Sequence, residues 1–478
     1  MEYEIIIGLE IHCELKTNTK CFCSCKNQFG APINTNVCPV CLGLPGALPT
    51  INKKAFEYAV KAGLAFECDI NDTAIFERKN YFYPDLPKAY QISQMEKNVC
   101  NNGKIVFNVN GTQKVVRLDN IHLEEDAAKS IHDPQTRSSF VDFNRSGVPL
   151  IEIVTMPDLR SADEAVAMLE QIKQTLTYID VSDCKMQEGQ LRCDVNLSVR
   201  KKGETIFNNR TEMKNLNSFK AVHRAIEYEA QRQINVIENG GTIERDSLKW
   251  DDEHNCNFVM RSKQSAQEYK YFADPDLLEV VISKEYVEKL NNNLPVLPEK
   301  RKKHYMEDLK LPEYDAKVLT GRKEISDYFE KCLTYYDNPK VVSNWVMGDI
   351  LRLLKEDLLL DEIDIKITPD NFTKLIKMVE NKEISQNASK EVLDEMWLNN
   401  EDCALIVERL GLKQVNDASE LIGIVKEIIS ENPQAVEDYK NGNKKTLTFF
   451  MGQTMKKSRG KANPQIVNKL IIDELDKI

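Results

Sequence analysis

A strict two-residue alternation at the start of the chain constrains its fold more than any other feature. Residues 3–15 read YEIIIGLEIHCEL. With a period of two, the apolar positions share one face: Ile5, Ile7, Leu9 and Ile11. The opposite face carries Gly8, Glu10, His12 and Glu14. This pattern predicts a strand buried on one side, whose polar side either lines a cleft or is simply solvated.

Two later segments present charged side chains in the same way. In LRCDVNLSV, which starts at Leu191, Asp194 lies on the polar face of a predicted strand. In RTEMKN, which starts at Arg210, extension would put Glu212 and Lys214 on one face with that arginine. Each segment alone is a weak indication, but the strands together collect carboxylates and cations in one part of the chain.

An acidic cluster, HLEED, adds a possible metal-binding segment. If it is extended, His122, Glu124 and Asp126 share one face and Glu125 lies on the other. Carboxylates that hold a metal, and cations that neutralise a phosphoryl group, are what ATP-dependent chemistry requires. The sequence has no GxxxxGK[ST] loop, kinase-type glycine loop or GxGxxG fingerprint. Any nucleotide site must therefore be an open-sheet, metal-centred one.

The cysteines are concentrated near the N-terminus. Of 13 cysteines, six fall between Cys13 and Cys41. A C-x-C pair and a C-x2-C pair supply Cys23, Cys25, Cys38 and Cys41 on a loop spanning residues 21–41. Four thiolates fit a tetrahedral zinc with no open position, which predicts a structural zinc rather than a catalytic one. The alternative is a group of reduced, inert cysteines.

Aromatic and basic residues alternate in RKNYFYPDLPKAYQISQ, residues 78–94. Lys79, Tyr81 and Tyr83 lie in it, and two prolines forbid a continuous helix. Such a segment can stack on nucleobases or on a terminal adenosine. It can equally be an ordered loop that covers the sheet.

The periodicity changes near residue 295, and this change sets the predicted domains. Residues 1–294 are expected to be α+β with a mainly antiparallel sheet; residues 295–408 and 409–478 are expected to be helical. The acidic N-terminus does not resemble a signal peptide, so we expect a cytoplasmic protein.

The charge of the chain is unevenly distributed. The net charge is −11, yet no acidic residue lies between Asp438 and Asp473. From charge alone, this basic stretch is either a solvated face or a binding surface.

Several long strings closely resemble one family. GLEIHCELKT, RKNYFYPDLPKAYQISQ, HLEEDAAKS, DFNRSGVPLIEIV, KMQEGQLRCDVNLSV and EMKNLNSFK resemble the B subunits of tRNA-dependent amidotransferases (GatB), and the resemblance runs essentially from end to end. It implies a cradle-shaped catalytic domain with a glutamine-synthetase-like sheet, a helical domain and a YqeY-like helical tail.

The resemblance also implies an activity and partners. The B subunit uses ATP and magnesium to phosphorylate the side-chain carboxylate of Glu-tRNA(Gln) or Asp-tRNA(Asn). Ammonia from the amidase, which is the A subunit, then displaces phosphate, within a heterotrimer completed by a small C subunit. The enzyme class is therefore a glutamine-hydrolysing carbon–nitrogen ligase.

Functional residues are carried over from the resemblance position by position. It places Glu10, His12, Glu125, Asp194 and Glu212 around the metals, with Glu124 as a neighbouring candidate. Strand alternation favours Glu124 over Glu125, and a bulge or turn at these two residues would reconcile the alternation with the resemblance. His12 is an unusual magnesium ligand; binding through water, or a manganese site, would account for it.

Further residues are expected to bind the substrates. Lys79, Arg210 and Lys214 are candidates for phosphate or carboxylate contacts, and Tyr81 and Tyr83 for the nucleotide or adenosine. The basic tail is expected to contact tRNA phosphates through Lys444, Lys445, Lys456, Lys457, Arg459 and Lys461.

Two rival functions share some of these features. A glutamine-synthetase-like ligase acting on a free small carboxylate would use the same strands, but it would need neither helical extension nor basic tail. A non-catalytic, zinc-stapled tRNA-binding scaffold would need the tail but not the carboxylates.

Overall fold

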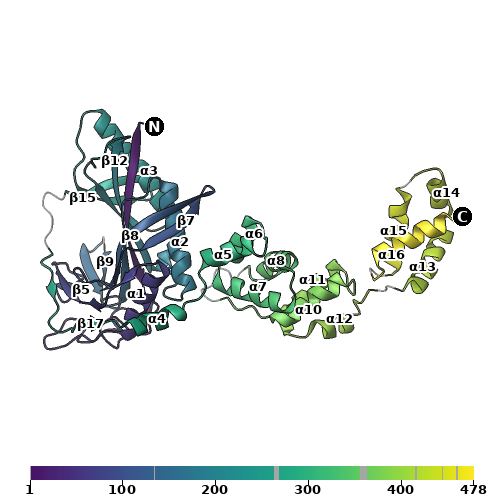
Figure 1. The fold of residues 1–478 in the computed structure, drawn as a ribbon, viewed down its shortest axis with the longest axis horizontal. Coiled ribbons are helices and arrows are strands. Elements are labelled where there is room, and N and C mark those ends of the chain that lie inside the picture. The colour runs from purple at the N-terminus through teal and green to yellow at the C-terminus, as the bar shows by residue number, and fades with distance from the viewer. Residues whose placement is uncertain are drawn as a thin grey trace. The chain divides into compact units, whose positions relative to one another are not determined.

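The computed structural model describes residues 2–133, 135–262, 269–355, 363–414, 417–443, 445–458 and 461–478. The chain divides into two compact units, Met1–Pro298 and Glu299–Ile478. The first unit is rich in strands and the second is helical (Figure 1). This mixed architecture confirms the predicted α+β class.

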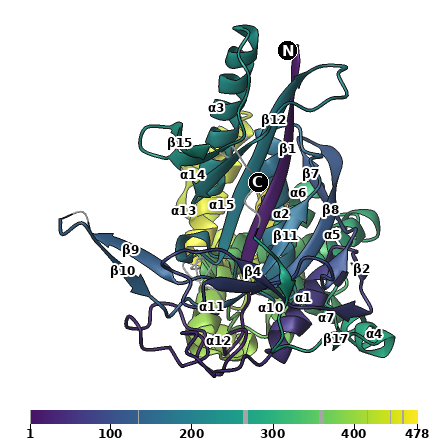
Figure 2. The same ribbon diagram turned by 90° about the vertical axis from the view of Figure 1, so that its left-hand side faces the viewer.

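A ten-stranded sheet organises the first unit (Figure 2). Its strands, in order across the sheet, are β15 (Cys256–Ser262), β14 (Asp246–Asp251), β13 (Thr211–Leu216), β12 (Leu191–Lys201), β1 (Tyr3–Glu14), β11 (Pro149–Thr155), β8 (Thr112–Glu125), β6 (Cys100–Asn101) and β2 (Asp69–Ile70), with β7 (Lys104–Val109) paired to β8. Among the described pairs only β13–β14 is parallel, as expected for a mainly antiparallel sheet.

Strand β1 lies at the centre and pairs on both sides, which fixes its two faces. It runs antiparallel to β12 and to β11. Its apolar residues Ile7, Leu9 and Ile11 are almost fully buried, and Ile5 is partly buried. The predicted alternation of β1 is therefore confirmed, and its polar residues lie on the other face of the sheet.

Three helices cover the apolar face of the sheet and complete the core. They are α1 (Lys53–Ala65), α2 (Ala162–Tyr178) and α3 (Phe219–Glu238). Each begins at a side-chain cap, in which Asn52, Ser161 or Ser218 accepts a hydrogen bond from a first-turn amide. Because the helices occupy only this face, the polar face of β1 stays available for chemistry.

Smaller elements surround the sheet. Strands β4 and β5 form a three-stranded sheet with β16, β3 pairs with β17, and β9 and β10 form a hairpin that projects from the unit (Figure 2). Their bounds, with those of the remaining elements of the unit, are β3 (Thr73–Ala74), β4 (Glu77–Asn80), β5 (Tyr90–Ser93), β9 (Lys129–Asp133), β10 (Ser138–Asp142), β16 (Phe272–Ala273), β17 (Val280–Val281), η1 (Met186–Glu188) and α4 (Lys284–Asn292).

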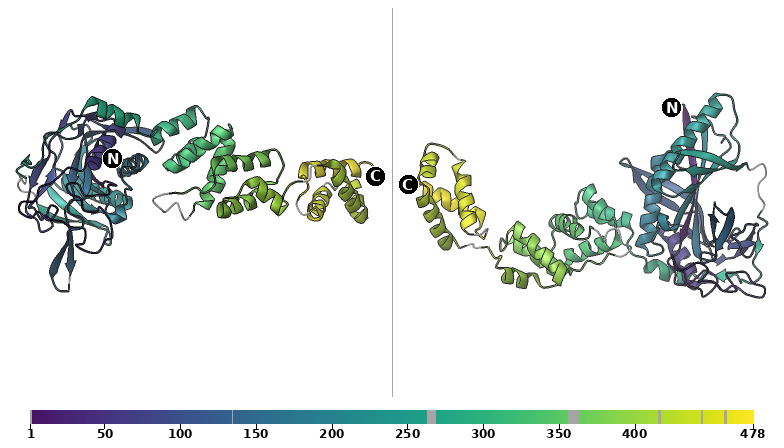
Figure 3. Two further views of the ribbon diagram at one scale, coloured as in Figure 1. Left: turned by 90° about the horizontal axis from the view of Figure 1, so that it is seen from below. Right: turned by 180° about the vertical axis from the view of Figure 1, so that it is seen from behind.

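The second unit is helical and has two hydrophobic clusters (Figure 3). The first cluster draws on α5 (Pro298–Glu307), α6 (Glu313–Leu319), α7 (Lys323–Tyr335), α8 (Pro339–Trp345), η2 (Val346–Ile350), α9 (Leu351–Leu353), α10 (Pro369–Glu380), α11 (Gln386–Asn399) and α12 (Cys403–Leu410). The second draws on α13 (Ala418–Glu431), α14 (Pro433–Lys440), α15 (Thr446–Lys457) and α16 (Pro464–Leu475).

The helical character predicted for residues 295–408 is seen in α7 and α10, each of which buries one face. In α7, Ile325, Phe329 and Cys332 are buried, and in α10 Phe372 and Leu375 are buried. Among the described residues, no helix combines the length and the apolar character needed to cross a membrane.

Candidate functional site

Three carboxylates from three strands meet on the polar face of the sheet. Glu10 of β1 lies directly opposite Asp194 of β12, and Glu212 of β13 pairs with Asn196 of β12. One ligand oxygen from each carboxylate lies within 4.8 Å of the others, so the three residues can hold a metal ion. Asn196 Nδ2 donates to Glu10 Oε1 at 2.9 Å, which fixes that carboxylate. We call Glu10, Asp194 and Glu212 the acidic cluster.

A lysine is built into the acidic cluster. Lys214 Nζ contacts Asp194 and lies 2.8 Å from Glu212 Oε1. Burial lowers the pKa of Lys214, but the two carboxylates more than offset this and raise it. Burial, together with the charges of Glu152 and Glu212, raises the pKa of Glu10. Lys214 contacts two of the three carboxylates and so balances only part of their charge, which leaves a site suited to a divalent cation.

A second group of possible ligands lies beside the first, and we call it the histidine cluster. It consists of His12 of β1, Glu124 of β8 and Glu152 of β11, again with ligand atoms within 4.8 Å. The register explains the meeting, because His12 lies opposite Glu152, which lies opposite His122. His12 Nε2 is 3.4 Å from Glu152 Oε2.

The carboxylate of Glu152 and the imidazoles of His12 and His122 shift one another's pKa. Despite burial, contacts with His12 and His122 hold the pKa of Glu152 well below its usual value. Burial opposes protonation of His122, but its contacts with Glu124 and Glu152 raise its pKa to about 9. The pKa of His12 is raised by Glu152 in the same way, against the effect of burial. Near neutral pH the two carboxylates of the cluster are therefore ionised, and the protonated imidazole of His122 balances part of their charge.

Residues 78–94 supply contacts to Glu124. They fold into β4, β5 and a connecting loop, and Ser93 Oγ of β5 donates to Glu124 Oε2 at 2.6 Å. Lys79 Nζ of β4 lies 3.7 Å from the same oxygen. Burial lowers the pKa of Lys79, and the charges of Glu124 and Glu152 more than compensate and raise it. Lys79 is thus placed at the histidine cluster.

The two tyrosines of this segment have different surroundings. The Tyr81 hydroxyl donates to Gln91 Oε1 at 2.8 Å, and its ring meets the edge of Tyr269 at 5.6 Å. Tyr83 is 59% exposed, and the neighbouring Phe82 is 87% exposed. The tip of the loop therefore presents exposed aromatic surface, whereas Tyr81 is partly buried.

Glu125 belongs to neither cluster. Its carboxylate contacts Lys88 Nζ and accepts a hydrogen bond from Ile92 N at 2.9 Å. The proposed bulge between Glu124 and Glu125 was wrong, because both residues pair in unbroken register with Leu150 and Pro149 of β11. Regular alternation turns the two carboxylates to opposite sides of β8.

Two other findings concern residues outside these groups. Arg210 is exposed and lies directly before β13, and its predicted place beside Glu212 and Lys214 stays a prediction. Glu152 was missed from the sequence, although it interrupts the apolar string LIEIV and so was a candidate for the polar face. Its partners depend on the pairing of β1 with β11, which the string alone does not reveal.

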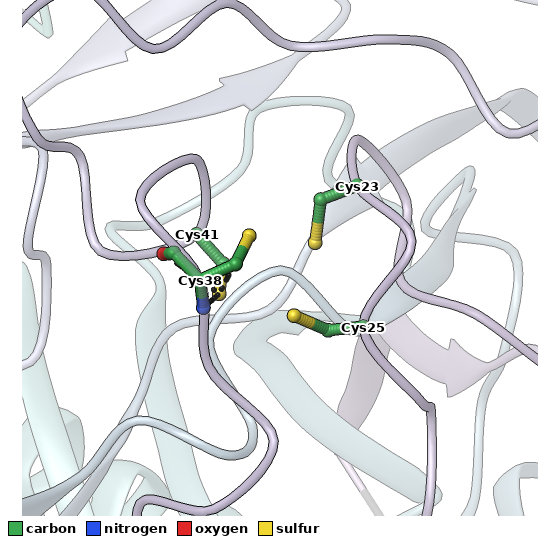
Figure 4. Close-up of side chains that lie close together, drawn as sticks. All are labelled: Cys23, Cys25, Cys38 and Cys41. Carbon is green, nitrogen blue, oxygen red and sulfur yellow. Dashed lines mark hydrogen bonds between the residues drawn. The ribbon is translucent and has the colours of Figure 1, made fainter.

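The cysteine loop brings its four thiols together (Figure 4). The sulfur atoms of Cys23, Cys25, Cys38 and Cys41 lie within 4.8 Å of one another and can hold a metal. Cys41 Sγ accepts a hydrogen bond from Cys38 N at 3.2 Å, as in metal-binding knuckles. The thiol of Cys23, the Cys38 amide and Lys20 lower the pKa of Cys41 to about 4, against the effect of burial. Cys21 is fully buried and stands apart from the four.

The basic residues of the tail differ in their surroundings. Lys445 and Lys456 are exposed, at the two ends of α15. Lys457 pairs with Glu427 at 2.7 Å and Glu431 at 3.7 Å. Lys461 is half-buried. The predicted tRNA contacts at Lys444 and Arg459 lie outside the described residues.

Comparison with known proteins identifies a family for the N-terminal part of the chain and for the C-terminal part. A family described as the GatB/GatE catalytic domain matches residues 5–288, and one described as the GatB domain matches residues 327–475. The B subunit of the aspartyl/glutamyl-tRNA(Asn/Gln) amidotransferase from Caldicellulosiruptor bescii is 52% identical over 480 residues, covering 100% of both chains. The proteins of the same name from Thermoanaerobacter pseudethanolicus and Persephonella marina are 49% and 48% identical, over at least 98% of either chain.

Proposed function

The chain belongs to the family of amidotransferase B subunits, and we propose that it activates the side-chain carboxylate of Glu-tRNA(Gln), Asp-tRNA(Asn) or both. ATP phosphorylates this carboxylate, and ammonia then converts it to the amide of Gln-tRNA or Asn-tRNA. The observation that carries the proposal is the pair of ligand clusters on the polar face of β1, within a chain that matches the family over its full length.

The chemistry requires activation because a carboxylate is a poor electrophile. Its charge repels nucleophiles, and oxide is not a viable leaving group. Phosphorylation replaces oxide by phosphate, and ammonia can then attack the carbonyl carbon. Because the acyl phosphate also reacts with water, the site must keep solvent from the carbonyl.

The acidic cluster and the histidine cluster are the proposed sites for catalytic metal ions. Magnesium, or manganese where His12 is a ligand, would supply positive charge to the phosphate oxygens of ATP when bound. Glu10, Asp194 and Glu212 would hold one ion, and His12, Glu124 and Glu152 a second. The oxygen-rich acidic cluster fits magnesium better than the histidine cluster does.

Two lysines are the proposed stabilisers of the negative charge that moves during the reaction. Lys214 contacts Asp194 and Glu212, and Lys79 lies beside Glu124. Each ammonium can turn from its carboxylate towards a phosphoryl oxygen as charge develops there. Arg210 is proposed as an outer phosphate contact. Glu125 is proposed to act from the other side of β8, together with Lys88.

The partners are those of a multi-subunit enzyme that acts on tRNA. We propose that an amidase, the A subunit, supplies ammonia and that a small C subunit completes the heterotrimer. The exposed ring of Tyr83 is proposed to stack on the terminal adenosine, with Tyr81 supporting the loop through Gln91. The tail is proposed to bind tRNA phosphates through Lys445, Lys456, Lys457 and Lys461, together with Lys444 and Arg459.

The cysteine loop is proposed to hold a structural zinc. Four thiolates fill all positions of a tetrahedral ion and leave none for a substrate. The loop joins the fold at the end of β1, because Asn27 Nδ2 donates to Leu15 O at 3.1 Å. Zinc would therefore hold the cysteine loop against the end of β1 without taking part in the reaction.

The dependence of ATP hydrolysis on tRNA tests the proposal. The assembled complex should hydrolyse ATP only when Glu-tRNA(Gln) or Asp-tRNA(Asn) is present. Equal turnover with free glutamate or aspartate and no tRNA would favour a small-molecule ligase. Undiminished amidation after Asp194→Ala, with tRNA still bound, would favour a non-catalytic scaffold.

A further inference from the structure

Lys20 is a fully buried lysine that has no carboxylate partner among the described residues. Its side chain has 0% exposure. Lys20 Nζ donates to Phe143 O at 3.1 Å and to Cys41 Sγ at 3.6 Å. Among the residues that the structure describes, neither these contacts nor any ion pair gives it a carboxylate. The ammonium is thus held between a backbone carbonyl and a cysteine sulfur.

A buried ammonium requires an anion. Lysine is almost never fully buried unless it is paired, because removal of its charge from water is costly. A carbonyl dipole offsets only part of that cost. The carboxylate of Glu125 is nearby, because a Cβ added to Gly147 would lie 3.6 Å from Lys20 Cδ and 3.7 Å from Glu125 Oε2. Glu125, however, contacts Lys88. The remaining source of negative charge is the thiolate of Cys41.

We propose that Lys20 is the counter-cation of the four-cysteine metal centre, acting as a positioning residue through Cys41. The proposal rests on the structural zinc proposed above. Zinc with four thiolates carries a net charge of −2, and a charge-assisted N–H···S hydrogen bond from Lys20 compensates part of it. Outer partners of this kind orient the ligands and tune the affinity for the metal.

The surrounding contacts bind Lys20, the cysteine loop and residues 143–147 into one unit. Lys20 N donates to Cys25 O at 2.9 Å, and Cys21 N donates to Gly147 O at 2.7 Å. Ser146 Oγ donates to Cys41 O at 3.1 Å. Residues 143–147 lead directly into β11, which carries Glu152. A charge-balanced centre therefore also fixes the start of a strand that contributes to the histidine cluster.

Replacement of Lys20 by an uncharged residue of similar length tests the proposal. The full-length Lys20→Met chain should bind zinc about 10- to 100-fold more weakly than the unaltered chain in competition with a chromogenic chelator. Lys26→Met is the matched control, because Lys26 follows Cys25 directly but is exposed. It should leave the affinity nearly unchanged. Cobalt substitution should give the same four-thiolate spectrum in all three proteins, since Lys20 is not itself a ligand.

Thermal unfolding separates this role from a merely structural one. Without metal, Lys20→Met should unfold at the same or a higher temperature than the unaltered chain, because an unpaired buried charge is removed. With zinc, it should gain less stability than the unaltered chain does. An equal loss of stability with and without metal would overturn the proposal, since it would mean that only the bond to Phe143 matters.

Two binding results would also contradict the proposal, in distinguishable ways. Equal zinc affinity of Lys20→Met and the unaltered chain would overturn the role of Lys20 and leave the zinc centre in place. Failure of the unaltered chain to bind zinc at all would overturn the centre and the role of Lys20 together.

Discussion

The strand clusters and the cysteine loop can both hold metals, yet they are built in opposite ways. The ligands of the strand clusters come from five strands that are distant in sequence and adjacent in the sheet: β1, β8, β11, β12 and β13. The ligands of the loop come from residues 23–41 alone. The sheet must therefore be complete before its clusters exist, whereas the loop carries its own ligand set.

The difference extends to ligand chemistry and to the neighbouring cations. Oxygen ligands with Lys79 and Lys214 beside them suit a hard ion and phosphate groups, and they leave room for exchange. Thiolates with a buried Lys20 behind them suit a permanently bound soft ion. The two regions of this unit therefore differ in ligand type and in the exposure of the neighbouring cation, because Lys214 is partly exposed and Lys20 is fully buried.

The largest effect is expected at the acidic cluster. Asp194→Ala removes one of three carboxylates and leaves Lys214 without one of its two partners. Amidation by the assembled complex should fall by about 10²- to 10³-fold or more, whereas glutamine hydrolysis by the partner amidase should continue. Asp69 is an exposed aspartate on β2, so Asp69→Ala is the control and should leave amidation unchanged. Amidation within twofold of normal would break the assignment of chemistry to the strand clusters.

A somewhat smaller loss is expected at Glu152. Glu152→Gln keeps the shape but removes the charge shared by His12 and His122. Amidation should fall by about 10²-fold, and the pKa of His122 should fall from its raised value of about 9. A pH titration by NMR measures this second effect. Glu238→Gln on α3 is an exposed control. An unchanged His122 titration would contradict the pairing of His122 with Glu152.

The sequence predicted the strands of these clusters but not their registers. Alternation placed Glu10, Asp194 and Glu212 on polar faces, and the structure brings them together. Glu152 was not predicted because its neighbours come from β1 and β8, and such long-range pairing leaves no local signal in the sequence. Arg210 is exposed directly before β13, so its predicted place beside Glu212 stays a prediction.

Lysines inside the fold, such as the fully buried Lys20 and the partly buried Lys88, are still harder to foresee. Lys20 and Lys88 look like ordinary surface residues in the sequence. Their partners become apparent only in the fold, where the cysteine loop brings Cys41 to Lys20 and the segment between β4 and β5 brings Lys88 to Glu125 of β8. By contrast, the four cysteines were predictable because their spacing is local.

Loss of the cysteine site should affect stability more than chemistry. Cys25→Ser should abolish the stabilisation by zinc, about 4 kcal/mol when free zinc is 1,000 times its Kd. Once assembled, the complex should still amidate within a few-fold of the normal rate. Unfolding with and without zinc, beside an amidation assay, measures both. A loss of amidation as large as that of Asp194→Ala would contradict a purely structural role of the cysteine site.

The smallest effects are expected for single lysines of the tail. Lys456 is exposed, so Lys456→Gln should reduce the salt dependence of tRNA binding by roughly one unit of slope. Lys457→Gln should change it less, because Lys457 is engaged by Glu427 and Glu431. Titrations of tRNA binding at several salt concentrations test this order. If both variants and the unaltered chain show the same salt dependence of tRNA binding, the proposed phosphate contacts of the tail are contradicted.

The central claim is that the strand clusters serve to phosphorylate a carboxylate, and one measurement addresses it directly. Glu-tRNA(Gln) with oxygen-18 in its side-chain carboxylate is amidated by the assembled complex, and the released phosphate is analysed by mass spectrometry. The account predicts that each phosphate gains one oxygen-18 atom, because the carboxylate oxygen leaves with it. Amide formation accompanied by unlabelled phosphate would contradict it.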